Sequence, residues 1–281
     1  MTTPTLQLLQ CGPRTLDLRR PRVMGIVNVT PDSFYDGGVH PDAARALDHA
    51  RAMVADGADL IDVGGESTRP GALLISEADE LGRILPVISA LAREGVLVSV
   101  DTMKPAVMRE AIAAGAVMVN DVRALRQRGA LDVVADSNVA VCLMHMQGEP
   151  RTMQEAPVYG DVVHEVRDFL IERALVCEGA GVTRARIVLD PGFGFGKTVA
   201  HNLALLKHLD VLVQSGYPVM AGLSRKASIG VITGRDPADR LAGSVAAALA
   251  AMARGARIVR VHDVRATVDA LKVWQAVEDQ G

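Results

Sequence analysis

The stretch VMGIVNV (23–29), followed by DAARALDHARAMVADG (42–57) and LIDVGG (60–65), decides the fold. The first and last segments are short and almost wholly apolar, which is typical of strands buried on both faces of a parallel sheet. The middle segment is alanine-rich and amphipathic, and it ends in a glycine that can cap a helix. A strand, a helix and a second strand in this order form the repeating unit of an α/β protein.

The same unit recurs along the whole chain. Further helical candidates are segments 76–95, 160–181 and 265–281, and the further strand candidates are VLVSVDT (96–102), VMVND (117–121), VCLMH (141–145), RIVLDPG (186–192), PVMAGLS (218–224) and RIVRVHD (257–263). An open doubly wound sheet is an alternative, but eight regular units favour closure into a barrel. The sequence therefore predicts a (β/α)8 TIM barrel of the α/β class.

Residues 1–21 precede the first predicted barrel strand. Within them, TLQLLQCGPRTLDL (5–18) alternates apolar and polar residues around a Gly-Pro pair. This pattern predicts an N-terminal β-hairpin that closes the bottom of the barrel. The chain has 281 residues, and such a barrel needs about 250. No Ser- or Pro-rich linker divides the sequence, so we expect a single domain over residues 1–281.

Composition excludes several classes of function. Aromatic residues make up 3% and the net charge is −3, so a base-stacking platform or a basic face for nucleic acid is not expected. Cys11, Cys142 and Cys177 are scattered without metal-ligand spacing, which indicates reduced thiols in a cytosol. No basic-then-apolar leader and no long uncharged apolar run appears. We expect a soluble cytoplasmic protein without membrane contact.

The segment DPGFGFGKT (190–198) looks like a phosphate-binding loop of NTPases. That motif needs a glycine where this chain has Pro191, which has no amide hydrogen and a fixed φ. The NTPase interpretation therefore fails. We interpret Lys197 as a charged residue, and Thr198 as a cap, at the start of the next helix.

Polar residues stand at the carboxyl ends of the predicted strands, where the active sites of such barrels lie. Asp62, Asp121 and His145 are among them. A first group suits a flat heterocycle with adjacent N–H, amino and carbonyl groups, and its members are Asp101, Asn120, Asp190 and Lys226. A second group suits an anion, with Asn28 as an oxygen ligand for Mg²⁺, and its members are Asn28, Thr68, Arg260 and His262. Each residue alone could be a cap or a structural pair, but the joint pattern indicates an enzyme pocket.

These segments carry a resemblance to a known family. MGIVNVTPDSFYDGG, DLIDVGGESTRPGA, VSVDT, NDV, MHMQGEPRTMQ, VLDPGFGFGKT, GLSRK and RVHDV together resemble dihydropteroate synthase over the chain from Val23 onward. The resemblance implies a (β/α)8 barrel. It also implies a transferase of folate biosynthesis that condenses 6-hydroxymethyl-7,8-dihydropterin pyrophosphate with p-aminobenzoate to give 7,8-dihydropteroate and pyrophosphate.

The resemblance implies a role for each matching position. Asp101, Asn120, Val122, Met144, Asp190 and Lys226 would bind the pterin. Asn28, Thr68, Arg260 and His262 would hold the pyrophosphate, with Asn28 acting through Mg²⁺. Phe34, Ser67, Arg69, Pro70 and Phe195 would form the p-aminobenzoate pocket, partly on loops 30–38 and 65–71 that close over the site. Asp101, Lys226, Arg260 and His262 would carry the catalysis.

Further expectations concern partners and mechanism. The resemblance implies sulfonamides as competing ligands and a homodimer, whose interface the apolar segment 240–256 could line unless it is simply buried. We expect a dissociative reaction in which pyrophosphate leaves before the aniline nitrogen attacks. The segment RALRQRG (123–129) departs from the glycine-rich form often seen in the family, which leaves the role of this fourth loop open.

Two alternatives remain. A methyltetrahydrofolate:corrinoid methyltransferase barrel shares the pterin residues but would lack the TPDSF and ESTRPG segments, which this chain has. A non-catalytic pterin-binding paralogue would be expected to have lost Lys226, Arg260 or His262, and all three are present.

Overall fold

The computed structural model describes residues 7–30, 39–67, 74–149 and 152–280. Its main sheet has eight parallel strands in the order β8-β7-β6-β5-β4-β3-β10-β9. They are β3 (Arg22–Asn28), β4 (Leu60–Gly64), β5 (Val98–Asp101), β6 (Met118–Asp121), β7 (Ala140–Met144), β8 (Ile187–Asp190), β9 (Met220–Ala221) and β10 (Ile258–Val261). A parallel bridge from Leu189 to Val219 joins the two ends of the sheet, so the closed barrel is confirmed over the open sheet.

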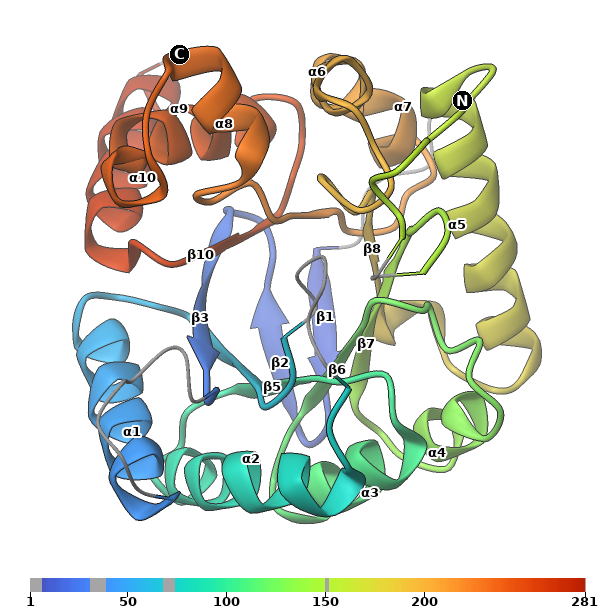
Figure 1. Cartoon of the computed structure of the whole chain (residues 1–281), viewed down its shortest axis with the longest axis vertical. Helices are drawn as coiled ribbons and strands as arrows, with labels where there is room; N and C mark the ends of the chain where they lie inside the picture. Colours follow the sequence, from blue (N-terminus) through green and yellow to red (C-terminus); the bar gives the residue numbers. More distant parts are fainter. Residues whose placement is uncertain (1–6, 31–38, 68–73, 150–151, 281) are drawn as a thin grey trace.

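Helices surround this barrel on all sides (Figure 1). The first five strand–helix units carry α1 (Val39–Ala55), α2 (Glu77–Arg93), α3 (Pro105–Ala113), α4 (Ala130–Ala135) and α5 (Val162–Gly179). Two units carry a pair of helices each: α6 (Val199–Lys207) with α7 (Leu209–Val213), and α8 (Ala227–Thr233) with α9 (Leu241–Met252). α10 (Val264–Glu278) follows the last strand. Within the described ranges, no helix is both long and apolar enough to cross a membrane.

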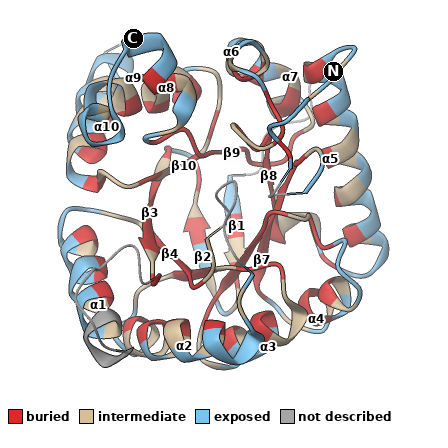
Figure 2. Ribbon diagram, viewed as in Figure 1, coloured by how far each residue is buried: buried red, intermediate tan, exposed pale blue. Residues whose placement is uncertain are grey.

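Burial follows from the two-residue period of the strands. Side chains that point outward, such as Val27, Ile61 and Val259, form the main core with the inner faces of the helices. The buried residues accordingly form a ring of strands and inward-facing helix stripes (Figure 2). Side chains of the opposite parity point into the barrel. This parity places Asp62, Asp101, Asn120, Asp190 and Arg260 inside, whereas Asp121, next to Asn120, has the opposite parity.

The predicted N-terminal hairpin is confirmed as β1 (Leu8–Cys11) paired antiparallel with β2 (Arg14–Asp17). A separate apolar cluster joins Leu9, Cys11, Leu16 and Leu18 to residues at the starts of the barrel strands, among them Met24, Leu60, Met118 and Ile258. The hairpin therefore fills the end of the barrel opposite the strand carboxyl ends.

Candidate active site

Polar side chains from separate strands converge inside the barrel, at the carboxyl ends of the strands. Asp62 lies on β4, Asp101 ends β5, Asn120 lies on β6, Asp190 ends β8 and Arg260 lies on β10. Register supports this grouping, because Asp101 pairs with Asn120 and with Gly64 on neighbouring strands. The closed sheet thus brings residues far apart in sequence into one cluster of polar side chains.

Asp62 is the centre of this group. Its side chain is fully buried, and one oxygen, Oδ2, accepts from Arg260 Nε at 2.6 Å and from Asn120 Nδ2 at 3.0 Å. The other oxygen, Oδ1, is buried without a hydrogen-bond partner among the described residues. The sequence places Asp62 at a strand end but assigns it no role. The structure shows that it orients one residue of each predicted substrate group.

Arg260 also reaches the carboxylate of Asp101, with Nη2 at 2.7 Å from Oδ2. Burial disfavours the cation, but the carboxylates of Asp62 and Asp101 together raise the pKa of Arg260. Burial raises the pKa of Asp101 to about 7, against the opposing effect of Arg260. A buried carboxyl with this pKa changes its charge near neutral pH.

Lys226 and Asp190 form the opposite wall. A Cβ placed at Gly222 would lie 3.9 Å from Lys226 Nζ and 4.0 Å from Asp190 Oδ2, so glycine leaves the space between these groups open. Burial lowers the pKa of Lys226 to about 8, although Asp190 opposes this shift. Burial likewise raises the pKa of Asp190, and Lys226 opposes that shift. The pair can offer a donor and an acceptor to one ligand.

His262 and Asn28 lie at the same end of the barrel. His262 is fixed by Ser224, whose Oγ lies 3.2 Å from the backbone N and 3.1 Å from Nδ1 of the histidine. Asn28 ends β3, and its Oδ1 lies 3.6 Å from the position of a Cβ at Gly64. An amide oxygen is a hard ligand, and Mg²⁺ commonly takes one or two protein oxygens and keeps its waters. Asn28 therefore fits the metal role by its chemistry.

An apolar wall adjoins the polar group. Val122, Met144 and Phe195 pack in one cluster with Met103, Met146 and Met153. The Phe195 ring centroid lies 4.9 Å from Lys226 Nζ, so an aromatic face borders the polar pocket. A flat ring bound between this wall and the carboxylates would place its faces against apolar side chains. Its polar edge would then meet hydrogen-bonding groups.

The family model described as a pterin binding enzyme matches residues 24–262. Dihydropteroate synthase of Escherichia coli strain K12 is 51% identical over 263 residues, covering 93% of this chain and 93% of that protein. The chain belongs to the dihydropteroate synthase family.

Two solved structures of dihydropteroate synthases agree with this assignment. The Xanthomonas albilineans enzyme with 4-aminobenzoic acid gives a TM-score of 0.92 at 58% identity, covering 98% of this chain and 99% of that chain. The Yersinia pestis enzyme in a sulfonamide drug complex gives 0.92 at 48% identity, covering 97% and 99%. The barrel architecture expected from the family resemblance is thus confirmed.

Some predicted site residues of the dihydropteroate synthase family lie outside the described part of the chain. These are Phe34, Thr68, Arg69 and Pro70. Ser67 is described and partly buried. The stem of its loop is tied together by Glu66 and Lys104, because Glu66 Oε1 accepts from Ile75 N at 3.1 Å and Lys104 Nζ donates to Ile75 O at 2.7 Å.

The segment 190–198 needs one correction. Thr198 does cap α6, since its Oγ1 accepts from His201 N at 3.2 Å. Lys197, however, is no ordinary charged residue at a helix start, because it is only 3% exposed and bonds to backbone carbonyls. His145, to which the sequence assigns no function, contacts Lys197 through Nδ1 at 3.0 Å. Nothing in the local sequence signals this contact, because the loop geometry creates it.

The fourth loop is held by Asp121, whose carboxylate accepts from Arg123 N and Leu125 N at 2.8 Å each. Ala124 and Leu125 have φ values of 51° and 56°, a conformation that favours glycine. Arg123 bonds to Glu149 at 2.5 Å. Part of the positive charge of this segment therefore forms an ion pair within the chain.

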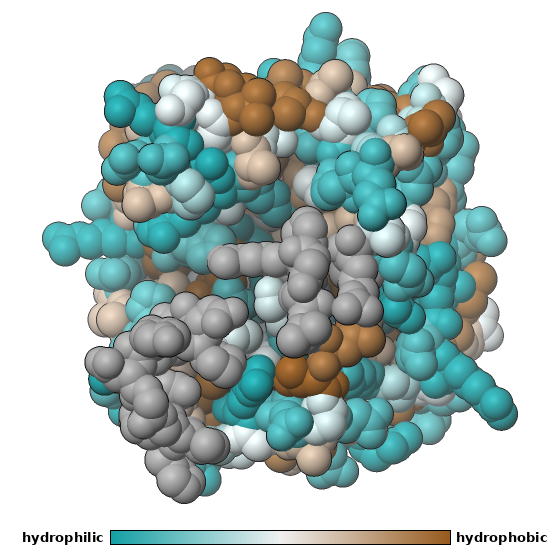
Figure 3. Space-filling view, in the orientation of Figure 1, coloured by the Kyte–Doolittle hydropathy of each residue, from teal (hydrophilic) through white to brown (hydrophobic). Residues whose placement is uncertain are grey.

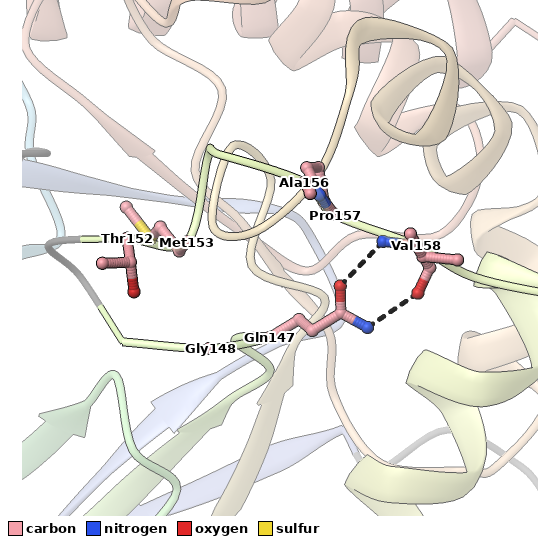
Figure 4. A pocket seen from close by; sticks show the side chains of 7 residues that line it. All are labelled: Gln147, Gly148, Thr152, Met153, Ala156, Pro157 and Val158. Carbon is pink, nitrogen blue, oxygen red and sulfur yellow. Dashed lines mark hydrogen bonds between the residues drawn. The ribbon is translucent and has the colours of Figure 1, made fainter.

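A cavity of about 270 Å³ lies in the connection between β7 and α5 (Figure 4). It is lined by Gln147, Gly148, Thr152, Met153, Ala156, Pro157 and Val158. Gln147 closes one side by hydrogen bonds to both backbone groups of Val158, at 2.8 and 3.1 Å. Within the described ranges, none of the predicted substrate residues lines this cavity, but Met153 also packs in the cluster of Val122, Met144 and Phe195, so the cavity adjoins the apolar wall of the site.

Proposed function

We propose that this chain joins 6-hydroxymethyl-7,8-dihydropterin pyrophosphate to p-aminobenzoate, with release of pyrophosphate. One observation supports this most strongly. A buried Asp62 couples Asn120, in the predicted pterin group, to Arg260, in the predicted pyrophosphate group. This link suits a substrate that carries both a pterin ring and a pyrophosphate. The bond that breaks, between these two parts, would then lie between Asn120 and Arg260.

The pterin half uses neutral and charged partners together. Asp190 Oδ2 and Lys226 Nζ both lie within 4.0 Å of the position of a Cβ at Gly222, and Asn120 is oriented by its bond to Asp62. These groups can pair with the amino, imine and carbonyl edge of the pterin. Val122 and Met144 would cover one face of the ring.

The pyrophosphate half is cationic. Nε and Nη2 of Arg260 donate to the carboxylates of Asp62 and Asp101, and its remaining N–H groups can donate to an anion. His262 is oriented by Ser224 beside it. Mg²⁺ held by Asn28 would supply further positive charge for the phosphates.

The bond to pyrophosphate breaks first in this proposal, leaving positive charge delocalised into the dihydropterin ring. Arg260 and His262 stabilise the departing anion, and ionised Asp101 stabilises the ring cation. The neutral aniline nitrogen of p-aminobenzoate then forms the new C–N bond and loses a proton to solvent. No strong base is needed for that attack.

The decisive test is pyrophosphate release. Purified protein, Mg²⁺ and both substrates should release one pyrophosphate per dihydropteroate formed, and omission of p-aminobenzoate should abolish dihydropteroate formation. Pterin binding without turnover would instead indicate the non-catalytic paralogue. Transfer of a methyl group to a corrinoid would indicate the methyltransferase alternative.

We also propose a homodimer. Val231 and Ile232 of α8 are 70% and 58% exposed, and Leu203 of α6 and Leu241 of α9 are 46% and 44% exposed. These helices are neighbours, and apolar atoms gather over α8 at the upper edge of the molecule (Figure 3). An apolar face of this kind suits association of two copies.

Sedimentation of the wild type and of Ile232→Glu tests the dimer. We expect a dimer that the variant shifts toward monomer, whereas Val277→Glu, at an exposed apolar site on α10, should leave the mass unchanged. A monomeric wild type at micromolar concentration would contradict the proposal.

Two smaller proposals follow from the family. Sulfonamides should compete with p-aminobenzoate, as the drug complex of the Yersinia pestis enzyme suggests. The three cysteines are free and buried, which supports a reducing cytoplasmic location. Competitive kinetics and cell fractionation test these two points.

A further inference from the structure

Lys197 is a buried lysine that the proposed reaction does not use, and burial lowers its pKa to about 7. Its Nζ lies 2.9 Å from the carbonyl oxygens of Gly192 and Phe195. It also lies 3.3 Å from the carbonyl oxygen and 3.0 Å from the Nδ1 of His145. An ammonium has three protons, so these acceptors take up its whole donor capacity. The amino group is therefore directed at the protein backbone and at His145, and not at a ligand.

His145 is a suitable acceptor for this contact. Burial and the nearby charge of Lys197 lower the pKa of His145 to about 3, so the imidazole is neutral at physiological pH. Its ring packs edge-on against Phe169, with centroids 4.9 Å apart, and lies 6.1 Å from the ring of Tyr159. Lys197 thus connects the loop after β8 to a firmly packed group after β7.

The loop after β8 depends on side chains for its shape. Gly192, Gly194 and Gly196 all have left-handed φ values, of 67°, 82° and 63°. Such a loop forms no regular ladder for its backbone groups. Side chains take that place, because every carbonyl from Gly192 to Gly196 accepts a side-chain hydrogen bond.

The donors come from four positions. Lys197 donates to Gly192 and Phe195, Lys226 to Phe193, Gln154 to Gly194 and Tyr159 to Gly196. Lys197 is the donor that serves two carbonyls, and it lies at the end of the loop. Its removal would leave the Phe195 carbonyl without its side-chain donor, and the buried Gly192 carbonyl with only the backbone N–H of Phe195, which is a costly way to lose hydrogen bonds.

We propose that Lys197 is a positioning residue for the p-aminobenzoate half of the site. The loop that it holds presents the Phe195 ring, and the carbonyl of Phe193 holds Lys226 beneath that ring. Asp190 is held mainly by its strand, in register with Met144 on β7, and its carboxylate also accepts from Gly192 N, at the start of the loop, at 2.7 Å. Loss of Lys197 should therefore disturb Phe195 more than the pterin carboxylate. This inference rests on the proposed function.

The test compares Lys197→Met with Lys207→Met, which removes an exposed lysine from the end of α6. For Lys197→Met we expect the KM for p-aminobenzoate to rise about tenfold, because two hydrogen bonds that hold the loop are lost. The Kd of pterin pyrophosphate, measured by calorimetry, should change less than about threefold, because its other contacts remain. Lys207→Met should match the wild type in both values.

The outcomes separate this inference from the proposed function. A wild type that releases no pyrophosphate refutes the function itself. An active wild type with an unchanged p-aminobenzoate KM in Lys197→Met, or with equal losses for both ligands, overturns the inference alone. If Lys197→Met does not fold, Tyr159→Phe and Gln154→Leu serve instead. Each removes one carbonyl donor and should raise the same KM about threefold without changing pterin affinity, and no rise in either variant overturns the inference.

Discussion

Asp62 and Arg260 meet inside the barrel through a contact of 2.6 Å between Oδ2 and Nε, although 198 positions separate them in the sequence. The same oxygen holds Asn120. One carboxylate therefore sets the orientation of groups that would bind opposite ends of the pterin substrate.

Asp62→Asn should lower kcat/KM by about a hundredfold, because it removes one of the two anions that hold Arg260 and leaves an amide in a buried, poorly paired position. Steady-state pyrophosphate release measures this loss. Asp59→Asn is the matched control, since Asp59 pairs with Arg22 at the other end of the barrel. The control should affect stability but not kcat/KM. Equal activity losses in both variants would show that Asp62 acts only on folding.

Arg260→Lys should weaken binding of the pyrophosphate substrate more than binding of hydroxymethyl-dihydropterin. A lysine keeps the charge but cannot span Asp62 and Asp101 while also facing an anion. Calorimetry with the two ligands gives the comparison, and Arg257→Lys on the same strand segment is the control. Equal losses for both ligands would remove Arg260 from the anion site.

Lys226→Ala should weaken pterin binding roughly ten- to a hundredfold, as expected for a lost charge-assisted donor worth about 1.5–3 kcal/mol. Turnover should fall further, because the Phe193 carbonyl loses its partner and the loop after β8 loosens. Lys207→Ala controls for the loss of a lysine charge. Unchanged pterin affinity would place Lys226 outside the site.

The rate should have a bell-shaped dependence on pH. Asp101 stabilises a cation only when ionised, and its raised pKa of about 7 makes kcat/KM fall as pH drops below that value. Lys226 donates fully only when protonated, and its lowered pKa of about 8 makes kcat/KM fall as pH rises above that value. A pH–rate profile measures both limbs. A flat profile between pH 5 and 10 would contradict both roles.

p-Aminobenzoate should bind after the pterin substrate. The pterin residues sit at buried strand ends, whereas Ser67, Arg69 and Pro70 belong to a segment rich in turn-forming residues. Titration of p-aminobenzoate into free protein should give little heat, and a clear signal should appear with pterin, pyrophosphate and Mg²⁺ present. Arg69→Ala should weaken only that second step. Tight binding to the free protein would refute this order.

The barrel could be predicted from sequence because each strand–helix unit carries its own signal. Val23 to Val27 is free of polar side chains, as expected for a strand between helices and a barrel interior. The grouping of Asp101, Asn120, Asp190 and Arg260 followed from one topological fact, since parallel strands place all their carboxyl ends at one face.

Contacts that arise only in three dimensions could not be predicted. Asp62 has the same local pattern as any polar strand end, and its link to Arg260 depends on barrel closure. Lys197 follows three glycines that alternate with phenylalanines, so its direction is set by left-handed residues at every second position and not by a helix or strand period. The roles assigned to Asn28, Thr68 and the p-aminobenzoate residues stay predictions.

The N-terminal hairpin affects how substrates enter and products leave the barrel. The hairpin residues Leu9, Cys11, Leu16 and Leu18 fill one end of the barrel together with the strand starts. Among the described residues this end is closed, so we expect small molecules to enter and leave at the carboxyl ends of the strands. Dihydropteroate and pyrophosphate must leave along the path by which the next p-aminobenzoate arrives. A bound product therefore prevents the next substrate from binding. Turnover should slow as products accumulate even while both substrates remain abundant.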